Sequence, residues 1–181
     1  MADFLTSLNI TLQHEGGYAD LVGDSGGETI FGISKNNHPK SSIWKELDNY
    51  KILLAPFDKS KYSKMNALCK NNRIIMNEVQ NIYFSEYWLK IKGDSIKIQE
   101  NANVLFDMAV NAGHSRAVKL AQEMLGIKVD GICGNVTIGA INSYGSDFCN
   151  AYTNKRIEWY KDRKNQTYIK AWVARAEKFR V

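Results

Sequence analysis

The chain has 181 residues and a formal net charge of +5, with 44% hydrophobic and 24% charged residues. A chain of this length buries roughly 70% of the surface that it exposes when unfolded, so it can fold without disulfide or metal cross-links. The composition excludes a disordered chain, and no run approaches the roughly 20 apolar residues that cross a bilayer, so we expect no stable membrane insertion. The surplus of basic residues favours an acidic partner, either nucleic acid or an anionic cell wall, or it forms a solvated surface.

Targeting and redox signals point to a protein made in a cytoplasm. The N-terminus lacks the basic segment and the apolar stretch of a Sec signal peptide. The three cysteines have no CxxC spacing, and none of the three histidines lies at ligand spacing from them. We therefore expect reduced thiols and no zinc site.

The first predicted element is a helix over residues 3–15, with Asp3 as N-cap and Gly16-Gly17 as the stop signal. Its apolar stripe consists of Phe4, Leu8 and Leu12, which recur every four residues. On such a helix Glu15 lies only about 20° around the axis from Phe4. The side chain of Glu15 is therefore expected to continue the apolar stripe.

The middle of the chain is less regular. Residues 16–37 are rich in Gly, Asp, Ser, Thr and Asn, which predicts turns and a short hairpin around Glu28–Ile33. Residues 38–70 carry only weak helix signals. A helix is predicted over Arg73–Lys90 and ends at Gly93-Asp94.

The C-terminal half is predicted to be helical. Helices are expected over Asn103–Ala112, from Ser115 as N-cap to Leu125 with a stop at Gly126, from Thr137 to Asn142, over Asp147–Arg163, and over Tyr168–Phe179. The chain as a whole is thus predicted to be mainly α, with a small β-hairpin or loop region near the N-terminus.

Glu15 is a candidate catalytic acid. Hydrolysis of a glycosidic bond usually needs a carboxylic acid that stays protonated near neutral pH, and burial among apolar neighbours favours the neutral form. The carbonyls at a helix C-terminus act in the same direction. Glu15 ends an apolar stripe, and the glycines that follow leave room for a sugar chain. The alternative is a solvated glutamate at a frayed helix end.

The residues around Glu15 form a longer pattern. The chain reads His14-Glu15-Gly16-Gly17-Tyr18 and then Asp24-Ser25-Gly26-Gly27-Glu28-Thr29-Ile30-Phe31-Gly32-Ile33. This string resembles the signature of the glycoside hydrolase 108 family, which are phage and bacterial N-acetylmuramidases. The family pattern is Glu-Gly-Gly-Tyr, followed by Asp-x-Gly-Gly-x-Thr-x-x-Gly-Ile. The resemblance implies a lysozyme-like fold and a hydrolase that needs no metal or organic cofactor.

The resemblance also implies roles for three residues. Glu15 takes the position of the family's general acid, and Asp24 and Thr29 would lie across the cleft and orient or activate a water. From the residues alone, Asp24 also suits a plain turn and Thr29 a plain strand. The segment between Tyr18 and Asp24 departs from the family pattern, which leaves open whether Asp20 or Asp24 is the second carboxylate.

Tyr18, Asp107 and Asn111 are candidates for substrate binding. The ring of Tyr18 either stacks on a sugar or covers the core. The segment Leu105–Gly113 also resembles the family, and its Asp107 and Asn111 are spaced i,i+4, so they share a helix face and can hydrogen-bond together. This polar pair either lines the glycan groove or anchors a buried turn.

The segment Val129–Thr137 resembles the Val-Asp-Gly-x-x-Gly-x-x-Thr of small peptidoglycan-binding modules. In it, Asp130 is expected to bond loop amides and Thr137 to cap the next helix. The resemblance therefore implies a catalytic region over residues 1–101 and a peptidoglycan-binding region over residues 102–181, packed as one globular unit. The implied partner is the glycan strand of peptidoglycan, with no nucleic acid, and the chain is expected to be a monomer.

The expected reaction is hydrolysis of the β-1,4 bond between N-acetylmuramic acid and N-acetylglucosamine. The expected setting is a phage or prophage endolysin, made in the bacterial cytoplasm and brought to the wall by a holin or another export route. A lytic transglycosylase that uses the same glutamate is one alternative. A non-catalytic wall-binding or secretion-accessory protein is another.

Overall fold

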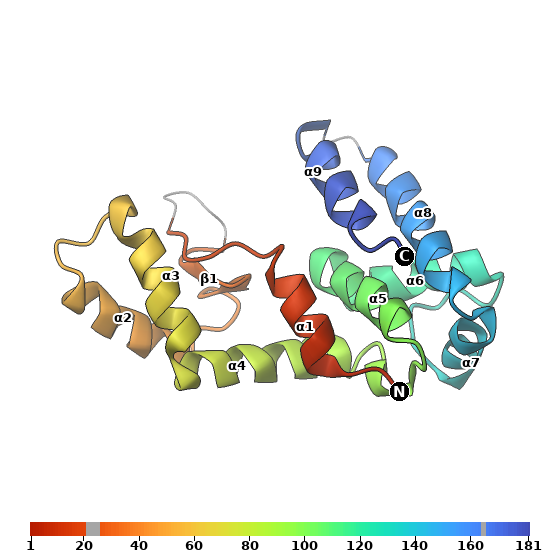
Figure 1. Cartoon of the computed structure of the whole chain (residues 1–181), viewed down its shortest axis with the longest axis horizontal. Coiled ribbons are helices and arrows are strands. Elements are labelled where there is room, and N and C mark those ends of the chain that lie inside the picture. Colours follow the sequence, from red (N-terminus) through yellow and green to blue (C-terminus); the bar gives the residue numbers. More distant parts are fainter. Residues whose placement is uncertain (21–25, 164–165) are drawn as a thin grey trace. The chain divides into compact units, whose positions relative to one another are not determined.

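The computed structural model describes residues 1–20, 26–163 and 166–181 (Figure 1). Its backbone contacts divide the chain into two compact units. Residues Leu12–Ile82 form the first, called here the hairpin unit. Residues Met1–Thr11 and Tyr83–Val181 form the second, called the helical unit.

The hairpin unit contains the β-structure that the sequence predicts. Strand β1 (Thr29–Ile30) pairs antiparallel with β2 (Ile33–Ser34), with Ile30 opposite Ile33. The two residues between the strands, Phe31 and Gly32, have φ angles of 49° and 77°. Positive φ at both positions is the tight turn that matches the twist of a hairpin. Gly32 adopts it without strain, and burial of the Phe31 ring, which is 5% exposed, offsets the strain at its own backbone.

Helices build the rest of the hairpin unit. They are α2 (Ile43–Leu53), the 3-10 turn η1 (Lys59–Lys61), α3 (Tyr62–Asn71) and all but the last residue of α4 (Arg73–Tyr83). Helix α2 packs against α3. The helix signals for α2 are weak because its buried residues, Ile43, Trp44 and Leu47, all lie in its first half. Its second half therefore shows no apolar periodicity.

The helical unit holds nearly all of α1 (Phe4–Leu12) and the C-terminal helices. These are α5 (Gln99–Ala112), α6 (His114–Leu125), α7 (Asn135–Tyr144), α8 (Asp147–Lys161) and α9 (Gln166–Glu177), preceded by the short turns η2 (Phe84–Trp88) and η3 (Gly93–Ser95). Helix α5 packs against α6 and α8, and α8 packs against α9 (Figure 1). Nine consecutive residues of α5 are buried, so this helix is the centre of the unit. The mainly α prediction is confirmed.

Helix α1 begins as predicted but ends early. The backbone N–H of Thr6 donates to Asp3 Oδ1 over 2.8 Å, which confirms Asp3 as the N-cap. The helix ends at Leu12, and Glu15 lies in a bend beyond it, so the prediction of a helix through Glu15 is wrong. The reason is tertiary: from Tyr18 onward the backbone bonds to α3 and to β1, and no local pattern marks those bonds.

The helix predicted over Arg73–Lys90 is present but changes pitch near its end. After α4 the chain forms a π-helical turn, in which Leu89 N–H donates to Phe84 O over 2.9 Å. The helical segment ends at Trp88, before the predicted stop, and Gly93 begins η3. Gly93 nevertheless has a steric role. A Cβ there would lie 2.2 Å from the indole of Trp88, which is fully buried. Only glycine lets the backbone pass so close to that ring.

The ends of α6 test two further predictions. Gly126, with a φ of 65°, ends the helix in the left-handed conformation, as expected. Ser115 is not the N-cap, because α6 already begins at His114. Gly113, with a φ of 87°, is the single residue between α5 and α6. Ser115 therefore already lies inside α6, one residue beyond its start.

The loop between α6 and α7 is organised by one buried side chain, Gln122. Its Nε2 donates to Asp130 Oδ1, to Ile132 O and to Thr137 Oγ1, and its Oε1 accepts from the N–H groups of Asp130 and Gly131. Asp130 Oδ1 also accepts from the N–H of Ile132 over 2.9 Å, which confirms the loop-bonding role expected of it. Thr137 does not cap α7, because that helix begins at Asn135 and encloses it. No helix among the described residues is long and apolar enough to cross a membrane.

Candidate active site

Glu15 and the two glycines after it have contrasting surroundings. The side chain of Glu15 is half-buried in the bend that follows α1. Among the described atoms, none lies within 4 Å of the place where a Cβ on Gly16 would stand. A Cβ on Gly17 would stand 2.2 Å from Asn66 Nδ2. The backbone next to Glu15 therefore borders open space at Gly16 and is pressed against α3 at Gly17.

The chain that leaves Glu15 is held at both α3 and β1. Tyr18 N–H donates to Asn66 Oδ1 over 2.6 Å. Ala19 and Thr29 exchange two backbone hydrogen bonds, of 2.9 and 2.8 Å. Because these bonds follow Glu15 so closely, they fix the backbone from which its side chain projects.

Tyr18 lies in the core of the hairpin unit. It is 4% exposed, and its ring meets those of Phe57 and Tyr62 edge-on, with centroids 5.5 and 4.8 Å away. Its hydroxyl donates to Glu28 Oε1 over 2.9 Å. Burial and this hydrogen bond both raise the pKa of Tyr18, so the hydroxyl remains a donor. This is the position expected of the alternative in which the ring covers the core.

Glu28 is the charged centre of the hairpin unit, and sequence reasoning missed it. It is 7% exposed, and its carboxylate accepts from Lys35 Nζ at 3.0 Å and from Lys51 Nζ at 2.5 Å, in addition to Tyr18. Burial alone would raise the pKa of Glu28, but the hydrogen bonds from Lys51, Lys35 and Tyr18 outweigh it, and the pKa is lowered. Glu28 is therefore ionised and ties the hairpin to α2. No local pattern could reveal this, because Lys51 lies far along the chain.

Thr29 lies at the start of β1, next to Glu28. Its side chain is half-buried, and its Oγ1 donates to Gly27 O over 3.0 Å. The backbone bridge to Ala19 places Thr29 beside the segment that follows Glu15. Asp24 lies outside the described residues. Asp20 is described and exposed, and its carbonyl accepts from Tyr62 Oη over 3.4 Å.

Asp107 and Asn111 belong to the helical unit, where they enter a buried polar network. Asp107 is fully buried and accepts from Arg156 Nη2 and from Arg175 Nη2, each at 2.7 Å. Arg156 also donates to Tyr160 Oη, which in turn donates to Asn111 Oδ1 over 2.6 Å. Arg156 and Tyr160 thus link the two predicted residues. The network joins α5, α8 and α9, as expected of a buried anchor.

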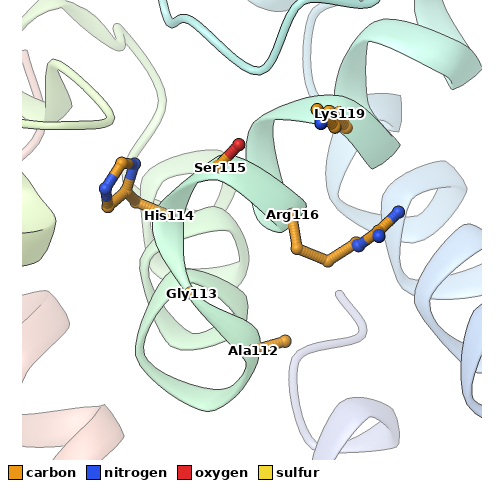
Figure 2. A pocket seen from close by; sticks show the side chains of 6 residues that line it. All are labelled: Ala112, Gly113, His114, Ser115, Arg116 and Lys119. Carbon is orange, nitrogen blue, oxygen red and sulfur yellow. The ribbon is translucent and has the colours of Figure 1, made fainter.

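A hollow of about 360 Å³ lies at the turn between α5 and α6. Figure 2 shows its side chains fanning outward, with His114 and Arg116 pointing to opposite sides of the turn. The guanidinium of Arg116 lies over the ring of Trp159, 5.6 Å from its centroid. The basic groups therefore do not converge on one point. Across the described residues, no cluster of three His, Cys, Asp or Glu side chains could hold a metal ion.

Comparison with known proteins connects this geometry to a family. Residues 8–113 match the family model described as Glycosyl hydrolase 108, and residues 116–177 match the model described as Predicted Peptidoglycan domain. The solved structure of SagA from Brucella abortus is similar, with a TM-score of 0.69 and 26% sequence identity. The alignment covers 97% of this chain and 90% of that one. No curated protein matches the chain.

The first of these models covers more than half of the chain, including Glu15, Tyr18, Glu28 and Thr29, and extends through Asp107 and Asn111. The second begins inside α6 and runs through α9, including the loop that Gln122 organises. The chain therefore belongs to the glycosyl hydrolase 108 family and carries a C-terminal peptidoglycan domain, which together make it a peptidoglycan hydrolase.

Proposed function

We propose that this protein is an N-acetylmuramidase that hydrolyses the β-1,4 bond between N-acetylmuramic acid and N-acetylglucosamine, with Glu15 as its general acid. One observation carries the proposal. A half-buried glutamate stands on a backbone fixed by Asn66 and Thr29, and no described atom lies within 4 Å of a Cβ placed on the neighbouring Gly16. A sugar chain needs such an exposed approach to bring its glycosidic oxygen to a carboxylic acid.

In the proposed mechanism Glu15 donates its proton to the leaving oxygen while positive charge develops on the sugar ring. A water attacks from the opposite face of the ring. Asp24 and Thr29 are proposed to orient or activate that water, and the bridge from Thr29 to Ala19 supports this role by keeping β1 beside the Glu15 segment. No step requires a metal or an organic cofactor.

The contacts of Tyr18, Asp107 and Asn111 support a structural role for these three residues. The polar group of each residue forms an internal hydrogen bond or ion pair. We propose that they hold the fold that carries the site. The proposed division remains a catalytic region over residues 1–101 and a wall-binding region over residues 102–181.

The proposed setting is a phage or prophage endolysin that is made in the bacterial cytoplasm and acts as a monomer on the wall after release by a holin or another export route. The net charge of +5 supports this setting, because an anionic wall attracts a basic protein. Such an enzyme is bacteriolytic, and it has no need of nucleic acid as a partner.

Loss of turbidity of purified peptidoglycan tests the proposal. We expect Glu15→Gln to lower the initial rate at least about a hundredfold, the scale for removal of a general acid. The matched control is Glu158→Gln, which makes the same change on an exposed face of α8 and should keep the wild-type rate. A Glu15→Gln protein that folds and still clears the suspension would refute the assignment.

Product analysis separates the remaining reactions that use the same glutamate. A muramidase leaves a reducing N-acetylmuramic acid end, because water attacks the sugar. A lytic transglycosylase leaves a 1,6-anhydro sugar instead. Binding of sacculi by the wild type without either product would identify a non-catalytic wall-binding protein.

A further inference from the structure

The segment of residues 127–137, which is the loop between α6 and α7 with the first residues of α7, has a rigid inner side and an apolar outer side. Gln122, which is 1% exposed, supports it from within by the five hydrogen bonds described above. Gly131 is also packed tightly, since a Cβ there would lie 2.6 Å from Ser115 Oγ. A loop held in this way is preorganised, so a ligand would lose little free energy in ordering it.

Two aliphatic side chains project from this segment into solvent, one from the loop and one from the start of α7. Ile132 is 68% exposed and Val136 is 73% exposed. Both line a hollow of about 420 Å³, whose wall also contains Lys92 and Lys128. Because the backbone is held in place, Ile132 and Val136 stay at the surface. A ligand that buries their apolar area would gain binding free energy.

The charges around the hollow favour an anionic ligand. Lys92 Nζ contacts only a neutral group in the described residues, Asn135 Oδ1 at 3.3 Å, and Lys128 is exposed. Asp130 is the acidic residue in the wall, but its Oδ1 is engaged by Gln122 and by the N–H of Ile132. The hydrogen bond from the Ile132 N–H, followed by that from Gln122, lowers the pKa of Asp130. Asp130 therefore stays ionised, and the two lysines outnumber this one carboxylate in the wall.

We propose that this hollow binds the peptide stem of peptidoglycan, a short peptide that combines carboxylates with alanine-sized side chains. The lysines would meet the carboxylates, and Ile132 and Val136 would cover the methyl groups. None of the described residues that line the hollow is aromatic, and aromatic rings are the usual platforms for sugars, which favours the peptide over the glycan strand. The inference rests on the proposed function in taking peptidoglycan as the substrate.

Calorimetric titration of the full chain with free tetrapeptide stem tests the proposal directly. A glycosidase does not cleave this peptide, so the reading is independent of lysis. We expect the pair Ile132→Ser and Val136→Ser to weaken binding at least about tenfold, and Lys128→Glu to weaken it several-fold with a loss of salt dependence. The controls are the pair Ile52→Ser and Leu53→Ser, which are 76% and 68% exposed in the hairpin unit, and Lys45→Glu on α2. The controls should bind the peptide as the wild type does.

The outcomes separate this proposal from the proposed function. Equal affinity of the Ile132→Ser, Val136→Ser protein and the wild type would overturn the site. Binding of peptide-free glycan strands, with no binding of the peptide, would overturn it as well. If the wild type lyses sacculi but does not bind the peptide, the peptide-binding site is overturned and the muramidase proposal is left in place. A wild type that binds the peptide at this loop but fails to cut glycan would refute the muramidase and leave the site in place.

Discussion

The hairpin unit and the helical unit neutralise a buried carboxylate in different ways. Asp107 in the helical unit is fully buried and is paired with two arginines, one of them also fully buried. Glu28 in the hairpin unit is 7% exposed and is paired with Lys35 and Lys51, whose side chains are 40% and 27% exposed. The first cluster is sealed inside a helical core, whereas the second reaches the surface through its lysines.

The comparison shows that burial alone does not identify a catalytic acid. Both carboxylates are buried more deeply than Glu15, yet each is committed to cations that tie helices or strands together. Glu15 differs in that its neighbour Gly16 is exposed, with no described atom within 4 Å of a Cβ placed there. An exposed backbone beside the carboxylate, rather than depth, distinguishes the candidate acid from the two structural carboxylates.

The largest effect is expected from Asp107→Asn. Arg156 has no exposed side-chain surface, so removal of the carboxylate charge leaves a guanidinium buried without its counter-ion. Breaking a buried pair in this way costs about 3–5 kcal/mol of unfolding free energy. Chemical denaturation followed by circular dichroism measures the loss. The matched control, Asp162→Asn on an exposed position after α8, should change stability by less than about 0.5 kcal/mol.

A smaller loss, about 1–3 kcal/mol, is expected from Glu28→Gln. The amide can still accept from Tyr18, and the two lysines, being partly exposed, can turn to water. The same denaturation experiment compares the two units directly. If Glu28→Gln proved more destabilising than Asp107→Asn, the contrast between a sealed and a water-accessible cluster would be wrong.

The acid side of the stability profile sharpens the comparison further. The pKa of Glu28 in the folded protein is lowered from an ordinary value of 4.5, so its ionised form stabilises the fold above that pH. This contribution is lost as the pH falls through the folded pKa. We expect the difference in melting temperature between wild type and Glu28→Gln to be constant from pH 7 to about pH 5 and to shrink below about pH 4.5. A melting-temperature difference that grew as the pH fell would contradict the lowered pKa of Glu28.

These clusters also show where sequence reasoning succeeds and where it stops. The Asp3 cap, the hairpin and the Gly126 stop were predictable, because each depends on residues that are neighbours in the chain. The family signature around Glu15 likewise consists of residues that are neighbours in the chain. The Glu28 cluster was not predictable, because Lys51 reaches it from another element. The early end of α1 was missed too, because the chain beyond Leu12 leaves the helix and enters tertiary bonds at Tyr18 that no local pattern marks.

Asn66→Ala tests that bond. It leaves the N–H of Tyr18 without its acceptor, which we expect to cost about 1–2 kcal/mol. Because Tyr18 follows Glu15 so closely, we also expect a several-fold slower loss of turbidity at temperatures where the protein is folded. Asn71→Ala is the control on the same helix, where the side chain bonds only the carbonyl of Ala67 among described contacts. Equal rates for the two variants would show that Asn66 does not position the acid.

The smallest change in stability is expected from Gly16→Ala, and it addresses the open space itself. No described atom lies within 4 Å of the added methyl group, so the unfolding free energy should change by less than about 0.5 kcal/mol. Gly17→Ala is the matched comparison: its methyl would lie 2.2 Å from Asn66 Nδ2 and would displace the amide that holds Tyr18, so this variant should lose stability. If the glycan passes over Gly16, the Gly16→Ala protein should be as stable as the wild type but slower on sacculi. A wild-type rate in that variant would mean that the sugar chain reaches Glu15 from another side.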